Sequence, residues 1–218
     1  QPLHRPSLPM PRWFNTAGPC RIDIHYMLPA IRRVPNLERL IAQQNYFVIH
    51  APRQVGKTTA MLALAKQLTE SGQYAAVMVS AEVGSPFNND PQRAEVAILS
   101  SWRSAARVYL PPELRPPAEQ EMAVGQGIEE TLRQWAQTSP RPLAIFIDEI
   151  DSLQNEILLS VLRQLRNGYS SRPQAFPQSI GLIGLRDVRD YKVAAGGSDR
   201  LNTSSPFNIK VRSLTLRN

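Results

Sequence analysis

The chain has 218 residues, a hydrophobic content of 42% and a formal net charge of +7. This length and composition suit one globular domain with a full α/β core. No stretch approaches the roughly 20 apolar residues that a membrane-spanning helix needs, and the N-terminus lacks the pattern of a secretory signal. The single cysteine, Cys20, excludes an intramolecular disulfide and a cysteine-based metal site. We therefore expect an intracellular, cytoplasmic protein that does not enter a membrane.

The positive charge is concentrated at the two ends of the chain. Basic and acidic residues nearly balance over residues 41–185, whereas residues 1–40 and 186–218 each carry an excess of basic residues. If the two ends meet in space, they form a basic patch that suits DNA. The alternative is that these side chains are simply solvated.

Strand-like and helix-like segments alternate along most of the chain. Residues 1–21 are rich in proline and lack periodicity, so we expect an extended arm there and a core domain over 22–218. Turn and proline residues predict a loop at 84–91 and a non-helical connector at 111–117. Alternation of this kind predicts right-handed βαβ units and a parallel sheet, which is the α/β class. The predicted strands are 46–50, 74–80, 143–147, 180–185 and 207–211, and the predicted helices are one within 22–44 and those at 57–70, 92–110, 126–137 and 152–166.

The stretch Ala51–Thr58 has the pattern of a phosphate-binding loop between a predicted strand and a predicted helix. In such a G-x-x-x-x-G-K-[ST] loop, backbone N–H groups surround the phosphates, the lysine reaches the β and γ oxygens, and the hydroxyl binds Mg²⁺. The following helix points its positive end at the anion. Ala51 replaces the first glycine, which is tolerated where φ is negative. The predicted nucleotide-binding residues are Pro52, Arg53, Gln54, Val55, Gly56, Lys57, Thr58 and Thr59.

A pair of acids follows the most uniformly apolar predicted strand, 143–147. Asp148 at the carboxyl end of that strand would lie beside the phosphate loop, where it can hold Mg²⁺ through water. Glu149 is then placed to polarise the attacking water as a catalytic base. We interpret Asp151 as a residue at a helix N-terminus, stabilised by the helix dipole.

Two segments of the chain resemble AAA+ and related STAND-type ATPases, and within them a group of bacterial AAA-like proteins. They are Ala-Pro-Arg-Gln-x-Gly-Lys-Thr-Thr at 51–59 and Ile-Phe-Ile-Asp-Glu-Ile-Asp at 145–151. The resemblance covers roughly residues 22–212. It implies a P-loop NTPase fold, a three-layer sandwich around a five-stranded parallel sheet with an additional strand between the two motif strands. It also implies ATP, and the sequence contains no Asn-Lys-x-Asp guanine signature.

The same resemblance implies three further roles and one missing part. Arg186 stands where the family senses the γ-phosphate, although most members have Asn, Ser or Thr there; the alternative is a surface arginine paired with an acid. Arg200 stands where a neighbouring subunit of a homo-oligomer contributes an arginine finger, or it is solvated. Tyr26 and Met27 would lie beside the adenine, or pack the arm onto the sheet. A helical lid usually follows the last strand in this family, and we expect it to be absent here.

Four functions compete on this evidence. The first is Mg²⁺-dependent hydrolysis of ATP coupled to a conformational or assembly switch. The second is a nucleic-acid-binding ATPase of the initiator or transposition-regulator kind, which predicts salt-dependent DNA affinity through the basic ends. The third is an ATP-binding regulatory module with negligible turnover. A small-molecule kinase is disfavoured, because the sequence carries the Asp148-Glu149 pair and lacks an acceptor signature.

Overall fold

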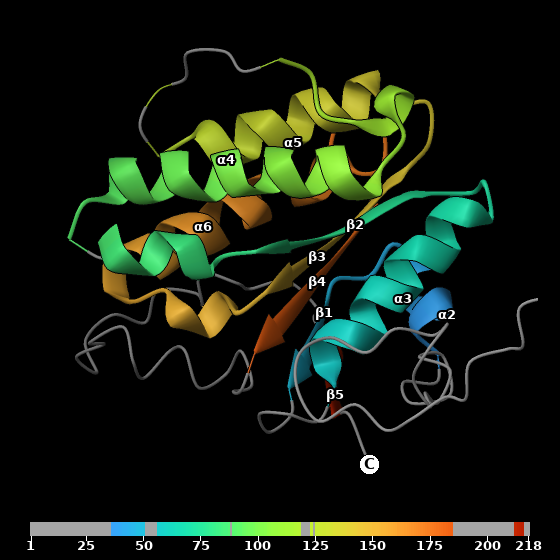
Figure 1. The fold of residues 1–218 in the computed structure, drawn as a ribbon, viewed down its shortest axis with the longest axis horizontal. Helices are drawn as coiled ribbons and strands as arrows, with labels where there is room; N and C mark the ends of the chain where they lie inside the picture. The colour runs from blue at the N-terminus through green and yellow to red at the C-terminus, as the bar shows by residue number, and fades with distance from the viewer. Residues whose placement is uncertain are drawn as a thin grey trace, which may run out of the picture.

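A parallel β-sheet lies at the centre of this computed structural model (Figure 1). The structure describes residues 36–50, 56–87, 89–118, 123, 125–184 and 212–215. The strands lie in the order β2-β3-β4-β1-β5, and each described pairing is parallel. The predicted α/β class and parallel sheet are confirmed. The strands are β1 (Phe47–His50), β2 (Ala75–Ser80), β3 (Leu143–Asp148), β4 (Ser179–Gly184) and β5 (Arg212–Thr215).

Helices cover both faces of the sheet and make three layers (Figure 1). One face carries α2 (Leu37–Ala42) and α3 (Lys57–Glu70), and the other carries α4 (Pro91–Tyr109), α5 (Gly127–Thr138) and α6 (Asn155–Asn167). Each face therefore has its own hydrophobic core. The 3₁₀ helices are η1 (Glu82–Phe87), η2 (Pro112–Leu114), η3 (Ile150–Ser152) and η4 (Gly168–Ser171).

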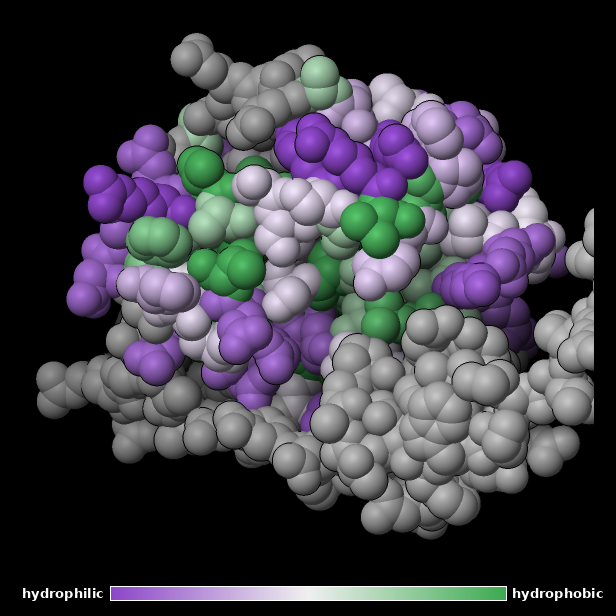
Figure 2. Space-filling model, in the orientation of Figure 1, coloured by the Kyte–Doolittle hydropathy of each residue, from purple (hydrophilic) through white to green (hydrophobic). Residues whose placement is uncertain are grey.

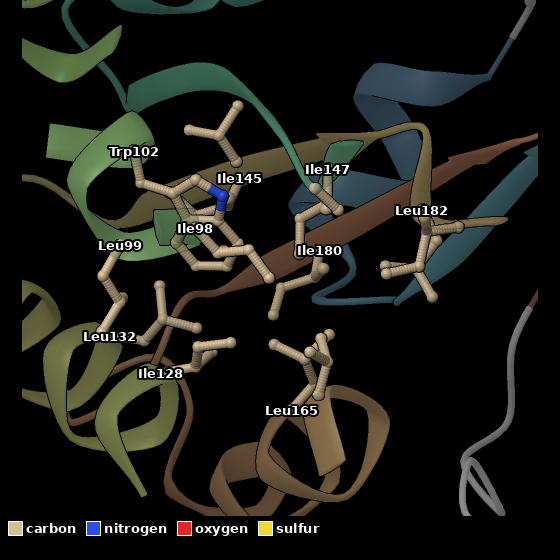
Figure 3. Close-up of a cluster of buried hydrophobic side chains, with 14 of the residues drawn as sticks. Ile98, Leu99, Trp102, Ile128, Leu132, Ile145, Ile147, Leu165, Ile180 and Leu182 are labelled. Atoms are coloured by element: carbon tan, nitrogen blue, oxygen red, sulfur yellow. The ribbon is translucent and has the colours of Figure 1, made fainter. Parts of the chain in front are cut away.

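β1 to β4 are apolar along most of their length because both sides of each one are buried. In β2, Val77 and Val79 pack toward α4, whereas Ala76 and Met78 pack toward α3. The core on the α4 side is the larger one and includes Trp102, which Figure 3 shows within a cluster of aliphatic side chains from the strands and helices. This double burial fixes the carboxyl ends of the strands, where the two sequence motifs lie.

Several element boundaries differ from the sequence prediction. The predicted helix at 152–166 begins later, at Asn155, because Leu153 adopts an extended backbone that separates η3 from α6. The predicted loop at 84–91 overlaps η1, which begins at Glu82. The connector at 111–117 contains η2, since a proline in a first helical turn has no N–H to satisfy. The described last strand is Arg212–Thr215, while the predicted strand at 207–211, the arm at 1–21 and residues 22–35 lie outside the described residues.

The surface of the α4 side is mixed in character. In the view of Figure 2, hydrophobic residues form small separate areas among hydrophilic ones. The exposed large hydrophobic side chains of the described residues are Val83, Val96, Val108 and Tyr109. Within the part of the chain that the structure describes, no helix has the length and apolar character to cross a membrane.

The amino end of α5 is held by a buried carboxylate from α4. Glu95 is 9% exposed, and its two oxygens accept the backbone N–H groups of Gly125 at 2.9 Å and Ile128 at 3.2 Å. Gln164 of α6 donates to the same carboxylate at 2.8 Å and accepts the N–H of Glu129 at 2.9 Å. The side chain of Glu95 thus joins the three helices on this face of the sheet.

We expect Glu95→Ala to lower the free energy of unfolding by about 1–3 kcal/mol, because it leaves buried donors without an acceptor. Denaturant unfolding measures this change. The control is Glu113→Ala, at an exposed glutamate in η2, for which we expect a change within about 0.5 kcal/mol. Equal effects of the two substitutions would contradict a structural role for Glu95.

Candidate functional site

The two sequence motifs meet at the carboxyl edge of the sheet. Thr58, in the first turn of α3, donates a hydrogen bond from Oγ1 to Oδ2 of Asp148, at the end of β3, over 2.8 Å. The two residues are 90 positions apart in the sequence. The structure therefore brings together the hydroxyl and the carboxylate that the sequence predicted to share Mg²⁺.

The start of α3 is shaped for a close turn. Gly56 precedes the helix with φ 77° and ψ 27°, a left-handed conformation that glycine adopts without strain. The first turn, from Lys57 to Ala60, contains no acidic residue, so no side-chain carboxylate of that turn competes for the positive end of the helix. This helix terminus is suited to an anion.

Asp148 is the most buried acid of the site, at 7% exposed. Burial raises the pKa of Asp148 above its ordinary value, against the opposing effects of the Thr58 hydrogen bond, the backbone N–H of Glu149 and the charge of Lys57. The N–H of Glu149 donates to Oδ1 of Asp148 at 2.9 Å. Both oxygens of this carboxylate are thus oriented by fixed donors.

Glu149 is exposed and lies in an unusual backbone conformation. Its φ is 54° and its ψ is 36°, in the left-handed region that a residue with a Cβ rarely adopts. A side-chain hydrogen bond with Glu82, partial burial and the charges of Glu82, Asp148 and Asp151 together raise the pKa of Glu149 to about 7. The predicted catalytic base therefore titrates close to neutral pH.

Glu82 is a residue of this site that the sequence analysis missed. It follows β2, whose last residue, Ser80, is paired with Asp148 in the register of the two strands. The N–H of Ala81 donates to the backbone carbonyl of Asp148 at 3.0 Å, and the N–H of Glu82 donates to Oγ of Ser80 at 3.1 Å. The available signal was an acid placed directly after a buried strand, the same signal that identified Asp148 and Glu149.

The remaining predicted site residues divide into two groups. Thr59 lies in the first turn of α3, and Asp151 lies in η3 rather than at the start of α6 as predicted, because the chain makes a separate 3₁₀ turn before Leu153. The other predicted residues lie outside the described residues, and their roles stay predictions. They are Tyr26, Met27, Ala51, Pro52, Arg53, Gln54, Val55, Arg186 and Arg200.

The described residues fit a magnesium nucleotide. A threonine hydroxyl and an aspartate carboxylate in contact are oxygen ligands of the kind that Mg²⁺ prefers. A lysine and a helix N-terminus beside them suit the negative phosphates. The chemistry of this donor set agrees with the prediction from the sequence.

The comparison with known proteins bears on the fold. No protein-family model matches the chain, and no curated protein does. Among solved structures the chain is similar to the Walker-type ATPase PABY2304 of Pyrococcus abyssi, with a TM-score of 0.51 and 12% identity over 93% of this chain and 56% of that one. It is also similar to Drosophila ORC bound to poly(dA/dT) DNA and Cdc6, with a TM-score of 0.49 and 12% identity over 86% of this chain and 29% of that one.

The chain spans little more than half of the archaeal protein and under a third of the second structure. The likeness to the archaeal protein concerns the fold alone, an α/β fold with a parallel sheet.

We expect Glu82→Gln to lower the pKa of Glu149 from about 7 toward its ordinary value. The amide removes a negative charge and still donates a hydrogen bond to the ionised Glu149, and both effects favour the charged form. The carboxyl ¹³C signals of labelled glutamate, followed by NMR against pH in the metal-free protein, measure this pKa. In the control, Glu156→Gln at an exposed position of α6, the titration of Glu149 should not move; an unchanged pKa in Glu82→Gln would refute the pairing.

Proposed function

We propose that the chain is an AAA+-like ATPase that binds ATP with Mg²⁺ and hydrolyses it to ADP and phosphate. The observation that supports this most strongly is the hydrogen bond between Thr58 and Asp148, with Glu149 next in the chain. A phosphate-loop hydroxyl, an acid at the end of a second strand and an exposed carboxylate next to it form a set of groups suited to nucleotide hydrolysis. The fold of the chain supports the same conclusion.

Different residues are proposed to bind the phosphates and the Mg²⁺ ion. Lys57 carries a positive charge to the phosphates, and the backbone of Gly56 and the first turn of α3 offer N–H groups to them. Thr58 and Asp148 are the residues that would hold Mg²⁺. The ion, when bound, neutralises charge on the phosphate oxygens. Pro52, Arg53, Gln54 and Val55 are proposed to complete the loop, as the sequence pattern predicts.

Glu149 is proposed to be the catalytic base. It must be ionised to accept a proton from the attacking water, and a pKa of about 7 lets it serve in that role near neutral pH. Its side chain is exposed, whereas that of Asp148 is buried, so Glu149 is the acid that water can reach. The hydrogen bond with Glu82 holds Glu149 beside the turn after β2, and it must break before Glu149 can accept a proton from water.

Hydrolysis at this site suits a nucleotide-driven conformational or assembly switch. The nucleotide would contact α3 and the ends of β1 and β3 together, so its presence or loss changes how these elements are held. Arg186 as a γ-phosphate sensor, and Arg200 as a finger from a second subunit, belong to this proposal on the sequence resemblance alone.

We expect Lys57→Ala to weaken ATP binding at least about tenfold and to abolish measurable hydrolysis, since the phosphates lose their charged partner. Calorimetry and release of inorganic phosphate measure the two effects. The matched control is Lys66→Ala on the same helix, where the lysine is exposed and pairs only with Glu70 at 3.7 Å. Survival of both binding and hydrolysis in Lys57→Ala would remove the phosphate-loop assignment.

We expect Glu149→Gln to retain ATP and to lose turnover by at least about a hundredfold, because the amide cannot accept the proton. Single-turnover hydrolysis with labelled ATP measures the loss, and filter binding measures the retention. Glu156→Gln, at an exposed position nearby, should behave as the wild type. If wild type and Glu149→Gln both retain ATP without turnover, the chain is a binding module and not a hydrolase, and equal measurable turnover in both would remove Glu149 as the base.

A further inference from the structure

A short turn after β2 carries Glu82 to the catalytic edge of the sheet. Two backbone N–H groups of this turn donate hydrogen bonds: Ala81 N–H to the carbonyl of Asp148 at 3.0 Å, and Glu82 N–H to Oγ of Ser80 at 3.1 Å. The first ties the turn to the end of β3, and the second closes the turn between residues 80 and 82. The position of this turn therefore decides whether Glu82 and Glu149 meet.

A tryptophan of α4 holds the same turn from its other side. The indole N–H of Trp102 donates to the backbone carbonyl of Ser80 at 3.0 Å. β2 is at the edge of the sheet, and the N–H of the next residue, Ala81, points toward β3, so the carbonyl of Ser80 points away from the neighbouring strand. Trp102 supplies the donor that none of the described strands provides there.

The ring of Trp102 is itself fixed in place. It is 1% exposed and lies in the core cluster shown in Figure 3, with Ile98 and Ile145. A buried ring of this size has little freedom to change rotamer. The indole N–H is therefore a rigid donor and not an adaptable surface contact.

η1 packs closely against α4. A Cβ built on Gly84 of η1 would approach the side chain of Ile98 to 2.8 Å and that of Leu153 to 3.0 Å. The segment that follows Glu82 thus lies directly against α4 on one side and against the start of the α6 segment on the other. A shift of α4 would be transmitted to Glu82.

We propose that Trp102 is a positioning residue for the hydrolytic site, acting through Ser80 and Glu82 on Glu149. This inference rests on the ATPase function proposed above. Trp102 does not contact the reacting groups; it fixes the carbonyl of Ser80, and with it the turn that presents Glu82. Lys57 and Thr58 do not belong to this turn, so its displacement should change turnover more than nucleotide binding.

The chain offers a matched control for the experiment. Trp135 of α5 is also 1% exposed and also donates its indole N–H to a backbone carbonyl, that of Leu114, at 2.8 Å. Leu114 lies in η2, between α4 and α5. Trp102→Phe and Trp135→Phe each remove one buried indole hydrogen bond and leave a smaller ring, so they share the general effects on the core.

Two readouts test the proposal. We expect Trp102→Phe to change kcat for ATP roughly tenfold, with KM within about twofold of the wild type, and Trp135→Phe to leave both nearly unchanged. Hydrogen exchange at the amides of Ala81 and Glu82 should quicken about fivefold or more in Trp102→Phe alone. If the two phenylalanine variants change kcat equally, or if those amides exchange at the wild-type rate in Trp102→Phe, the proposal is overturned.

A second variant tests the turn itself, also in the case in which Trp102→Phe fails to fold. Ser80→Ala removes the acceptor of the Glu82 N–H without touching the core, and it should change kcat in the same direction and quicken exchange at Glu82. Absence of Lys57-dependent hydrolysis in the wild type would remove the proposed function instead. The exchange measurement needs no turnover, so it still decides whether Trp102 holds the turn.

Discussion

The hydrogen bond between Thr58 and Asp148 joins the helix that follows one strand to the end of another, and a third strand of the sheet lies between the two. β4 lies between β1, which leads to α3, and β3, which ends at Asp148. Neighbouring strands are about 4.8 Å apart, so the two motif strands are separated by roughly 10 Å. The first turn of α3 must therefore extend over the end of β4 for Thr58 to reach Asp148 at 2.8 Å. Both strands are buried on both faces, which holds their ends in the register that this contact needs.

Two locally unfavourable features of the described chain lie side by side at this edge of the sheet. Asp148 is a buried carboxylate, and Glu149 is an acid in a left-handed conformation beside a second acid, Glu82. A left-handed conformation costs a residue with a Cβ about 1–2 kcal/mol. Features of this kind persist where the surrounding structure forces them, and they are typical of functional sites. The strained backbone of Glu149 thus lies at the residue that we propose as the catalytic base.

The sequence was sufficient to predict the elements and the first contacts of the site. The predicted helix at 57–70 has those bounds in the structure, because Gly56 fixes its start and Gly72 with a positive φ follows its end. The meeting of Thr58 with Asp148 also followed from sequence, since the carboxyl ends of parallel strands share one edge. The predicted start of α6, at residue 152, was wrong because the apolar spacing continues through Leu153, where the backbone is extended.

The sequence could not predict the contacts that join elements distant in the chain. Trp102 has the spacing of an ordinary core residue of α4, and nothing in its neighbours indicates that its N–H meets Ser80, 22 residues earlier. Glu82 and Glu149 come from two different strand ends, and their approach depends on the order of the strands in the sheet. Pattern and propensity act over a few residues, whereas these contacts are set by packing of the whole layer.

The raised pKa of Glu149 links the stability of the protein to its chemistry. The folded protein holds this proton up to about pH 7, whereas the ordinary value is 4.5. The folded state thus binds the proton more tightly than the unfolded chain, and the free energy of unfolding falls as the pH rises through that interval. In the proposed mechanism the ionised form of Glu149 accepts a proton from water, so the form proposed to be active is also the less stable one. Mg²⁺ bound beside Asp148 with the nucleotide would favour the ionised form of Glu149. Binding of the magnesium nucleotide would then restore the stability that ionisation removes.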